Sequence, residues 1–256
     1  MILRRLTENL RAQNWTAIGL EFLIVVIGVF LGTQVANWNQ ARIDRRETGL
    51  LIVELKPALQ GFIDFFDTAR VYYATANRYG DRAFAGWRRD PAIDDEQFVI
   101  AAYQASQIYV FALNGENWAN IFGRERLRDI GDTDVRRGLT TLMTTNYDQI
   151  EAGAVATRYR EEVRKVIPAD IQDEIRAKCG NRPHPQTQAG LYLPPACDLD
   201  IAAERFAAAA TALRQRPDLV GELRWHRAAV ATFIANLDFI DEQTRTLQRN
   251  IDESTR

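Results

Sequence analysis

The sequence predicts an all-α protein with one N-terminal transmembrane helix followed by an antiparallel helical-bundle domain with long coiled-coil-like helices. Three observations lead to this prediction. Residues 17–36 form an apolar run with a single charge, AIGLEFLIVVIGVFLGTQVA. Residues 219–251 repeat apolar side chains at alternating steps of four and three, which is the spacing of a helical seam. The 256 residues include only 15 Gly and 8 Pro, too few for many short strands joined by turns.

The first element is a transmembrane helix over residues 16–38, which follows a short cytoplasmic N-terminus over residues 1–15. Twenty apolar residues at about 1.5 Å rise each span roughly 30 Å, the thickness of the hydrocarbon core. Trp15 and Trp38 bracket the run and are expected to anchor it, because aromatic rings favour the membrane–water boundary.

A cleaved signal peptide is the alternative for this segment. The run is longer than the apolar core of a usual signal peptide, and it contains Glu21. Gln34 and Asn37 also stand where a cleavage site needs small residues. These features favour a retained span.

One face of the span is expected to contact another helix. Glu21, Val25, Gly28, Gly32 and Val35 follow 4-3-4-3 spacing and therefore share a narrow stripe. Gly28 and Gly32 form a G-x-x-x-G pair, which lets a second helix approach closely. The stripe predicts a homo- or hetero-oligomer that assembles through this helix within the lipid bilayer.

Glu21 allows two interpretations, because a carboxyl group inside the hydrocarbon region is costly unless it is protonated, paired or able to reach the interface. In the first, it lies about one turn inside the boundary and reaches toward the headgroups beside Arg11. In the second, it is a protonatable group of an ion-conducting complex. The first interpretation is favoured.

The residues from Gly19 to Asn39, GLEFLIVVIGVFLGTQVANWN, resemble the first helix of an uncharacterised family of bacterial single-span membrane proteins, a domain of unknown function. Members of that family open with E-hydrophobic-VVIG-hydrophobic-Q-x-x-NWN. The matching positions here are Glu21, Val25, Val26, Ile27, Gly28, Gln34, Asn37, Trp38 and Asn39. A looser similarity continues through Asn114, Gly115, Leu127 and Arg128 to the helix near Tyr147. The resemblance implies a bacterial membrane location and adds no chemistry.

Cysteine usage predicts the side of the membrane on which the soluble part lies. Arginines flank the span evenly: Arg4, Arg5 and Arg11 before it, and Arg42, Arg45 and Arg46 after it. This tie leaves the positive-inside rule nearly uninformative. Cys179 and Cys197 are the only cysteines, and they border a Pro-rich segment, CGNRPHPQTQAGLYLPPAC, that excludes a regular helix.

A disulfide between Cys179 and Cys197 would close this loop, and disulfides persist in the periplasm but rarely in the cytosol. We therefore expect a cytoplasmic N-terminus and a periplasmic domain over residues 39–256, anchored in the bacterial inner membrane. Two reduced cysteines remain one alternative. A metal site that adds His184 is another, although its spacing matches no zinc motif.

The soluble part begins with a helix over residues 42–79 that continues from the span. Its apolar stripe comprises Leu55, Leu59, Phe62, Phe66, Ala69, Tyr73 and Ala76. Pro57 should kink or interrupt this helix, because proline removes a backbone donor and crowds the preceding turn. The stretch over 86–95 is a connector.

Five further helical stretches are expected before the seam. The first covers 95–113, with Phe98, Ala102, Ala105 and Tyr109 on one face, and the second covers 116–130. Asp132 should cap a long helix that runs to about Ile167, followed by a short piece that ends near Lys178. The fifth stretch is the Ala-rich segment over 198–213.

The last helix starts at Pro217 and carries the clearest pattern in the chain. Its seam comprises Leu219, Leu223, His226, Val230, Phe233, Leu237, Ile240, Thr244, Leu247 and Ile251. A straight helix about 50 Å long is expected. Its expected partner is the helix that follows the span, in an antiparallel bundle.

No catalytic constellation is visible in the sequence. His226 shares the seam with Leu223 and Val230, which favours a hydrogen-bonded core residue over a catalyst. A set of six aromatic residues could line a groove, but packing between helices is the favoured interpretation: Tyr72, Tyr73, Trp87, Tyr103, Tyr109 and Trp118. Adjacent acids such as Asp94–Asp95 are expected to be solvated.

The sequence thus favours a non-enzymatic, membrane-anchored interaction or sensory domain that binds an unknown protein partner. No cofactor or metal is expected. The net charge of -2 argues against a nucleic-acid partner. The alternative is a subunit of a transport or proton-driven complex in which Glu21 titrates.

Overall fold

A computed structural model describes residues 15–109, 127–150, 152–187 and 190–254, and these residues are mostly helical. The all-α class is therefore confirmed. The described elements are α2 (Trp15–Glu54), α3 (Lys56–Trp87), α4 (Asp95–Gln104), α6 (Thr133–Thr144), η1 (Asp148–Ile150), η2 (Ala152–Val155), α7 (Arg158–Val166), α8 (Ala169–Cys179), β1 (Arg182–Pro183), β2 (Leu191–Tyr192), α9 (Ala203–Arg214) and α10 (Asp218–Ser254).

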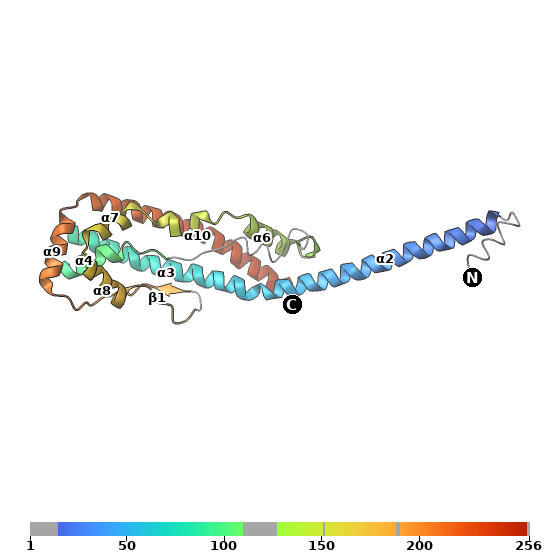
Figure 1. Ribbon diagram of the computed structural model, residues 1–256, viewed down its shortest axis with the longest axis horizontal. Coiled ribbons are helices and arrows are strands. Elements are labelled where there is room, and N and C mark those ends of the chain that lie inside the picture. The colour runs from blue at the N-terminus through green and yellow to red at the C-terminus, as the bar shows by residue number, and fades with distance from the viewer. Residues whose placement is uncertain (1–14, 110–126, 151, 188–189, 255–256) are drawn as a thin grey trace.

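The described helices form a long bundle from which α2 extends alone (Figure 1). Helices α3 and α10 run side by side in opposite directions along the bundle. Helix α6, the two short 3-10 helices and α7 pack along α10. Helices α4, α8 and α9 gather at the end of the bundle that is remote from α2 (Figure 1).

The interruption predicted at Pro57 is a single residue. Leu55 alone separates α2 from α3, and its backbone angles, φ -73° and ψ -23°, are still in the right-handed helical region. Its N–H donates to the Leu51 carbonyl over 3.1 Å, and Pro57 occupies the first turn of α3, where its missing N–H costs nothing. The apolar helix therefore passes into the bundle without a loop.

The α10 seam is confirmed, because all ten of its predicted residues are buried. It faces α3, which carries the predicted stripe from Leu59 onward, and every member of that stripe, Leu55 included, is buried except the half-buried Phe62. The rings of Tyr73 and Phe233 meet across this contact with centroids 5.2 Å apart. The two long stripes build the core in the way that antiparallel amphipathic helices bury their apolar faces.

The helix predicted over 95–113 is shorter than expected, because α4 ends at Gln104. Its start agrees with the prediction: Asp94 and Gln97 form a reciprocal capping box. After Gln104 the chain forms hydrogen bonds that do not continue the helix. The Ser106 hydroxyl donates to the Tyr103 carbonyl over 2.6 Å, and the Tyr109 N–H donates to the Tyr73 hydroxyl over 3.1 Å. Of the helix predicted over 116–130, residues 116–126 lie outside the described residues, while 127–129 are helical.

The long helix predicted from Asp132 to Ile167 is wrong as a single element. Asp132 does cap its start, accepting bonds from the Asp134 and Val135 N–H groups over 2.9 and 3.0 Å. The chain then leaves the helix after Thr144, and the Asn146 side chain accepts a bond from the Asp148 N–H over 2.9 Å. This local turn competes with the α-helix. Only the short 3-10 helices η1 and η2 follow among the described residues before α-helix resumes in α7.

The Ala-rich helix also starts later than predicted, at Ala203 instead of residue 198. The Leu199 N–H donates to a Glu96 carboxylate oxygen over 3.4 Å. This contact holds the chain against α4 in place of a first helical turn.

Candidate functional site

The Cys-bordered segment is closed by a disulfide between Cys179 and Cys197, whose Cα atoms are 5.6 Å apart. As predicted, its prolines exclude helix. The segment contains the antiparallel pair β1–β2, in which Arg182 faces Tyr192. Because both sulfur atoms are used in the disulfide, the alternative metal site with His184 is wrong. Among the described residues, no group of three or more His, Cys, Asp or Glu could hold a metal ion.

This segment is fixed to α3 and to the chain that follows α4 through tyrosine hydroxyl groups. Tyr79 donates to the Pro194 carbonyl over 2.8 Å, and the Tyr109 hydroxyl accepts from the Leu191 N–H over 2.9 Å. Burial raises the pKa of Tyr79, so this hydroxyl stays protonated and able to donate. The disulfide segment is thereby part of the bundle surface.

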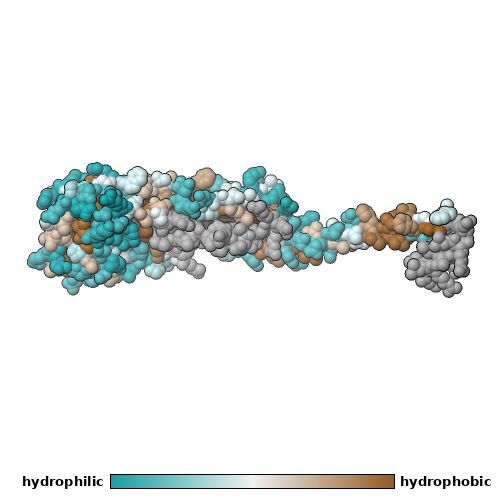
Figure 2. Space-filling model, turned by 45° about the horizontal axis from the view of Figure 1, so that its top comes forward, coloured by the Kyte–Doolittle hydropathy of each residue, from teal (hydrophilic) through white to brown (hydrophobic). Residues whose placement is uncertain are grey.

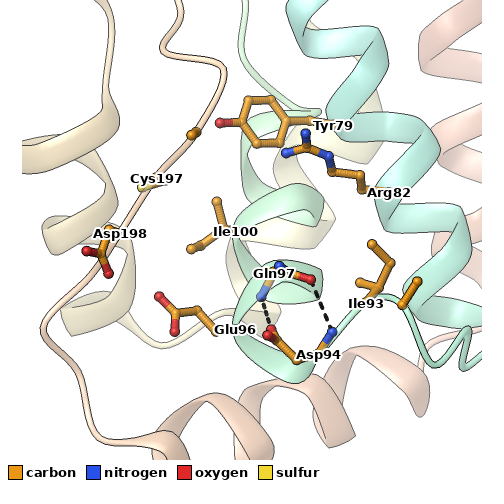
Figure 3. A pocket seen from close by; sticks show the side chains of 11 residues that line it. Tyr79, Arg82, Ile93, Asp94, Glu96, Gln97, Ile100, Cys197 and Asp198 are labelled. Atoms are coloured by element: carbon orange, nitrogen blue, oxygen red, sulfur yellow. Dashed lines mark hydrogen bonds between the residues drawn. The ribbon is translucent and has the colours of Figure 1, made fainter.

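A recess of about 600 Å³ lies between this segment and helices α3 and α4 (Figure 3). Tyr79 and Arg82 come from α3, Glu96 and Ile100 from α4, and Cys197 lies opposite them. A volume of this size is within the range of small-molecule sites.

The polar groups of the recess are largely committed to the fold. Asp94 and Gln97 bond one another at the start of α4, as the dashed lines in Figure 3 show. Glu96 accepts the Leu199 N–H, and Arg82 donates to the Pro195 carbonyl over 3.4 Å. The described lining includes no His, Ser, Thr or unpaired Cys. The recess therefore offers contacts to a polar molecule but no nucleophile paired with a base.

His226 lies in the core, as its place on the seam predicted. Its Nδ1 and the Thr157 Oγ1 share a hydrogen bond of 2.8 Å, and its ring lies 5.7 Å from that of Tyr159. Burial, assisted by the nearby charge of Arg160, lowers the pKa of His226 to about 4. The imidazole is therefore neutral at pH 7.

The described members of the predicted aromatic set pack between helices, and none of them lines the recess shown in Figure 3. Tyr72, Tyr73, Tyr103 and Tyr109 are buried, and the Trp87 indole donates to the Leu213 carbonyl over 3.1 Å. The rings of Tyr72 and Tyr109 meet edge to face at 5.2 Å. Trp118 lies outside the described residues.

The apolar part of α2 is long enough to span a membrane, and none of its most apolar 18-residue window, of mean hydropathy 2.1, is buried. Figure 2 shows these apolar residues gathered on α2 away from the bundle, whose visible face is mainly hydrophilic. Trp15 and Trp38, at the two ends, are 74% and 65% exposed.

The predicted association stripe lies uncovered on this helix. Val25 and Val35 are exposed, and a methyl group added at Gly28 or Gly32 would meet no atom within 4 Å. Glu21 is half-buried, and its Oε2 is a buried oxygen without a hydrogen-bond partner in the described part of the chain. The helix brings all five stripe residues to one side, and Val25, Gly28, Gly32 and Val35 are uncovered there.

No known protein family, curated protein or solved structure matches this chain. The resemblance of the span to single-span bacterial proteins therefore stays a prediction, and a functional conclusion must come from the geometry of the chain itself.

Proposed function

We propose that this protein is a non-enzymatic interaction or sensory domain anchored in the bacterial inner membrane by one helix. In this proposal residues 16–38 span the bilayer, the N-terminus lies in the cytoplasm, and the helical bundle lies in the periplasm. The observation that carries it is the continuity of α2 with α3, since the only residue between them is Leu55 in helical conformation. A change at the bundle surface can then reach the span through one uninterrupted element.

The disulfide supports the periplasmic location. Cys179 and Cys197 close a segment that is bonded to α3, and such bonds persist in oxidising compartments. The uncovered stripe around Gly28 and Gly32 supports assembly through the span, because small residues allow close backbone approach between helices in lipid.

Thiol labelling tests the topology, because the chain has only two cysteines. Spheroplasts would be treated with a membrane-impermeant maleimide before and after a reductant, with a Cys179→Ala/Cys197→Ala variant as the unlabelled control. Labelling from outside only after reduction is expected. Labelling only after lysis would place the bundle in the cytoplasm and refute the proposed topology.

Substitutions in the span test the assembly. Gly28→Leu and Gly32→Leu are expected to abolish cross-linking between copies in membranes. Val29→Leu, one position off the stripe, is the matched control. Since a Cβ added at either glycine would meet nothing within 4 Å apart from the helix's own backbone, the added side chains leave the single chain undisturbed. Unchanged cross-linking in both glycine variants would remove the stripe as an interface.

A second candidate function, a subunit of a transport or proton-driven complex, is favoured by one observation: Oε2 of Glu21 has no hydrogen-bond partner among the described residues. Intramembrane acids are functional candidates by default. Glu21→Gln separates the two functions. Lost assembly would indicate packing, whereas intact assembly with lost ion flux would indicate a proton relay.

A further inference from the structure

Two arginines of α7 reach across the bundle to the end of α4. Arg160 and Arg164 are one turn apart and therefore share a helix face. Arg160 donates to the Ser106 carbonyl over 2.6 Å. Arg164 donates to the Ser106 hydroxyl over 3.3 Å and to the Gln107 side-chain oxygen over 3.2 Å, and its guanidinium lies 4.7 Å from the centre of the Tyr103 ring.

These two guanidinium groups have only neutral partners. In the described part of the chain, neither forms an ion pair, although both are half-buried. Several other half-buried arginines of the bundle are paired: Arg70 with Asp241 over 2.6 Å, Arg214 with Asp95 over 2.8 Å and Arg216 with Glu162 over 3.1 Å. Among the described residues, the half-buried Arg136 and Arg182 also form no ion pair and bond backbone carbonyl oxygens. The pair on α7 differs from these two in placing two such guanidinium groups one turn apart on the same helix face.

The acidic groups nearby are already engaged. Glu161, next to Arg160, binds Lys165 over 2.6 Å. Glu162 is shared between Lys165 and Arg216. A third arginine, Arg176, bonds the Tyr103 hydroxyl over 3.1 Å and pairs with Asp173. None of these carboxylates therefore neutralises the positive charges of Arg160 and Arg164.

The C-terminus of α4 compensates part of this positive charge, which would be a purely structural role for the two arginines. The two side chains bond groups just past the end of α4, and a helix C-terminus carries about half a negative charge. Two guanidinium charges exceed that amount. Burial, and then repulsion from Arg160, lower the pKa of Arg164 to about 10, so it remains protonated at pH 7 in a site that disfavours its charge.

The site is open to a ligand. A recess of about 460 Å³ is lined by Thr157, Arg158, Arg160, Glu161 and Arg164. No guanidinium nitrogen of Arg160 or Arg164 is among the buried unpaired atoms of the described residues, so their spare N–H groups face solvent. The recess also includes the start of α7, which has no side-chain cap because the Thr157 hydroxyl bonds His226. Free N–H groups at a helix start favour anions.

We propose that Arg160 and Arg164 bind the phosphate group of a small water-soluble ligand, which makes this recess the sensing site of the domain proposed above. A phosphate monoester carries nearly two negative charges near pH 7, which would balance the two positive charges of Arg160 and Arg164. Guanidinium groups bind its oxygens through paired N–H donors. The site lies at the end of the bundle remote from α2 (Figure 1), which favours a soluble phosphate over a lipid headgroup.

Thermal unfolding of the full chain in a neutral detergent tests this site. Inorganic phosphate and glycerol phosphate would be compared with chloride at equal ionic strength. A saturable rise of Tm with either phosphate is expected, because a ligand that binds only the folded chain stabilises it by mass action. Equal Tm values in phosphate and chloride would overturn the proposal.

Variants locate the binding. Arg160→Gln and Arg164→Gln are each expected to weaken phosphate binding about tenfold or more, since each removes charged hydrogen bonds. Arg164→Lys should weaken it less. Arg137→Gln, an exposed arginine paired with Asp134 on α6, is the control and should bind phosphate as the wild type does. Wild-type affinity in both glutamine variants would overturn the assignment.

Nanodiscs separate the two phosphate sources. The chain would be placed in phosphatidylcholine discs with or without phosphatidylglycerol, in the absence of free phosphate. No Arg160-dependent change of Tm is expected, and a stabilisation by phosphatidylglycerol that Arg160→Gln removes would refute the soluble ligand. Phosphate binding by a chain that is labelled only after lysis would refute the topology alone, whereas periplasmic labelling without phosphate binding would refute this site alone.

Discussion

His226 shows how a single buried polar residue links the core to solution conditions. Its ring sits in the α10 seam, where hydrogen bonding to Thr157 and contact with Tyr159 fix it. A charged imidazole would have to be desolvated there beside the positive charge of Arg160. The folded chain therefore resists protonation that the unfolded chain accepts freely.

The stability of the fold should consequently fall in mild acid. The pKa of His226 is about 4 in the folded chain against 6.5 ordinarily. Between these pH values the unfolded state binds more protons, so the free energy of unfolding decreases as the pH falls from about 6.5 to about 4. The full loss is roughly 3 kcal/mol. Thermal unfolding of the full chain in detergent at several pH values measures it.

The control is His226→Gln, which removes the titrating group and keeps a polar side chain. Carboxylates titrate in both chains, so the difference between the two pH profiles isolates the histidine. Parallel profiles for the wild type and the variant between pH 6.5 and 4 would contradict the assigned role.

Residue-scale sequence analysis found His226 but not the arginine pair. His226 was recognisable because its neighbours on the seam, Leu223 and Val230, are apolar. Arg160 and Arg164 lie in a stretch of mixed charges, RYREEVRK, that is typical of a solvated helix face. Their contacts with Ser106 and Gln107 cross more than fifty residues of sequence, so no local pattern indicates them.

Among the elements, α10 was predictable because its pattern is long. Ten positions in steps of four and three, eight of them apolar, leave little alternative to one helix. The segment from Asp132 to Ile167 has a weaker pattern, and polar residues around Asn146 offer the backbone local bonds instead. The early end of α4 depends in part on a distant partner, since the Gln104 side chain donates to the Cys179 carbonyl over 2.7 Å.

Two phenylalanines on α10 allow a matched test of this packing. Phe233 is 1% exposed, whereas Phe239 is 64% exposed. Phe233→Ala should lower the free energy of unfolding by about 3–5 kcal/mol through lost burial and a residual cavity. Phe239→Ala should change it by no more than about 0.5 kcal/mol. Denaturant unfolding followed by circular dichroism compares them, and equal effects would place Phe239 in a contact that the fold does not show.

For the whole molecule, the direct passage of α2 into α3 couples the rotation of the span to that of the bundle. Arg46 follows Gly28 by 18 residues, which is five turns at about 3.6 residues each, so both lie on one side of α2. Asp44 lies about 160° away. Copies that meet through the stripe should therefore present Arg46, and not Asp44, to one another.

Photo-cross-linking in membranes tests this coupling. A photoreactive amino acid at position 46 is expected to join two copies, and one at position 44 is not. Inserting two alanines between Asn39 and Gln40 rotates the following helix by about 200°. In the chain with the insertion, the photoreactive amino acid at position 44 should join two copies, and the one at position 46 should not. Equal cross-linking from both positions, with or without the insertion, would show that the two parts rotate independently.

In the proposed membrane position, the exposed stretch of α2 beyond Trp38 also sets the distance between the lipid and the bundle. The first buried residue after the span is Thr48, and the nine residues from 39 to 47 rise about 14 Å. A single α-helix with its side chains is about 10–12 Å wide. If residues 16–38 span the bilayer as proposed, the bundle is held above it by slightly more than the thickness of one helix, which leaves room for another polypeptide to lie flat on the membrane beneath it.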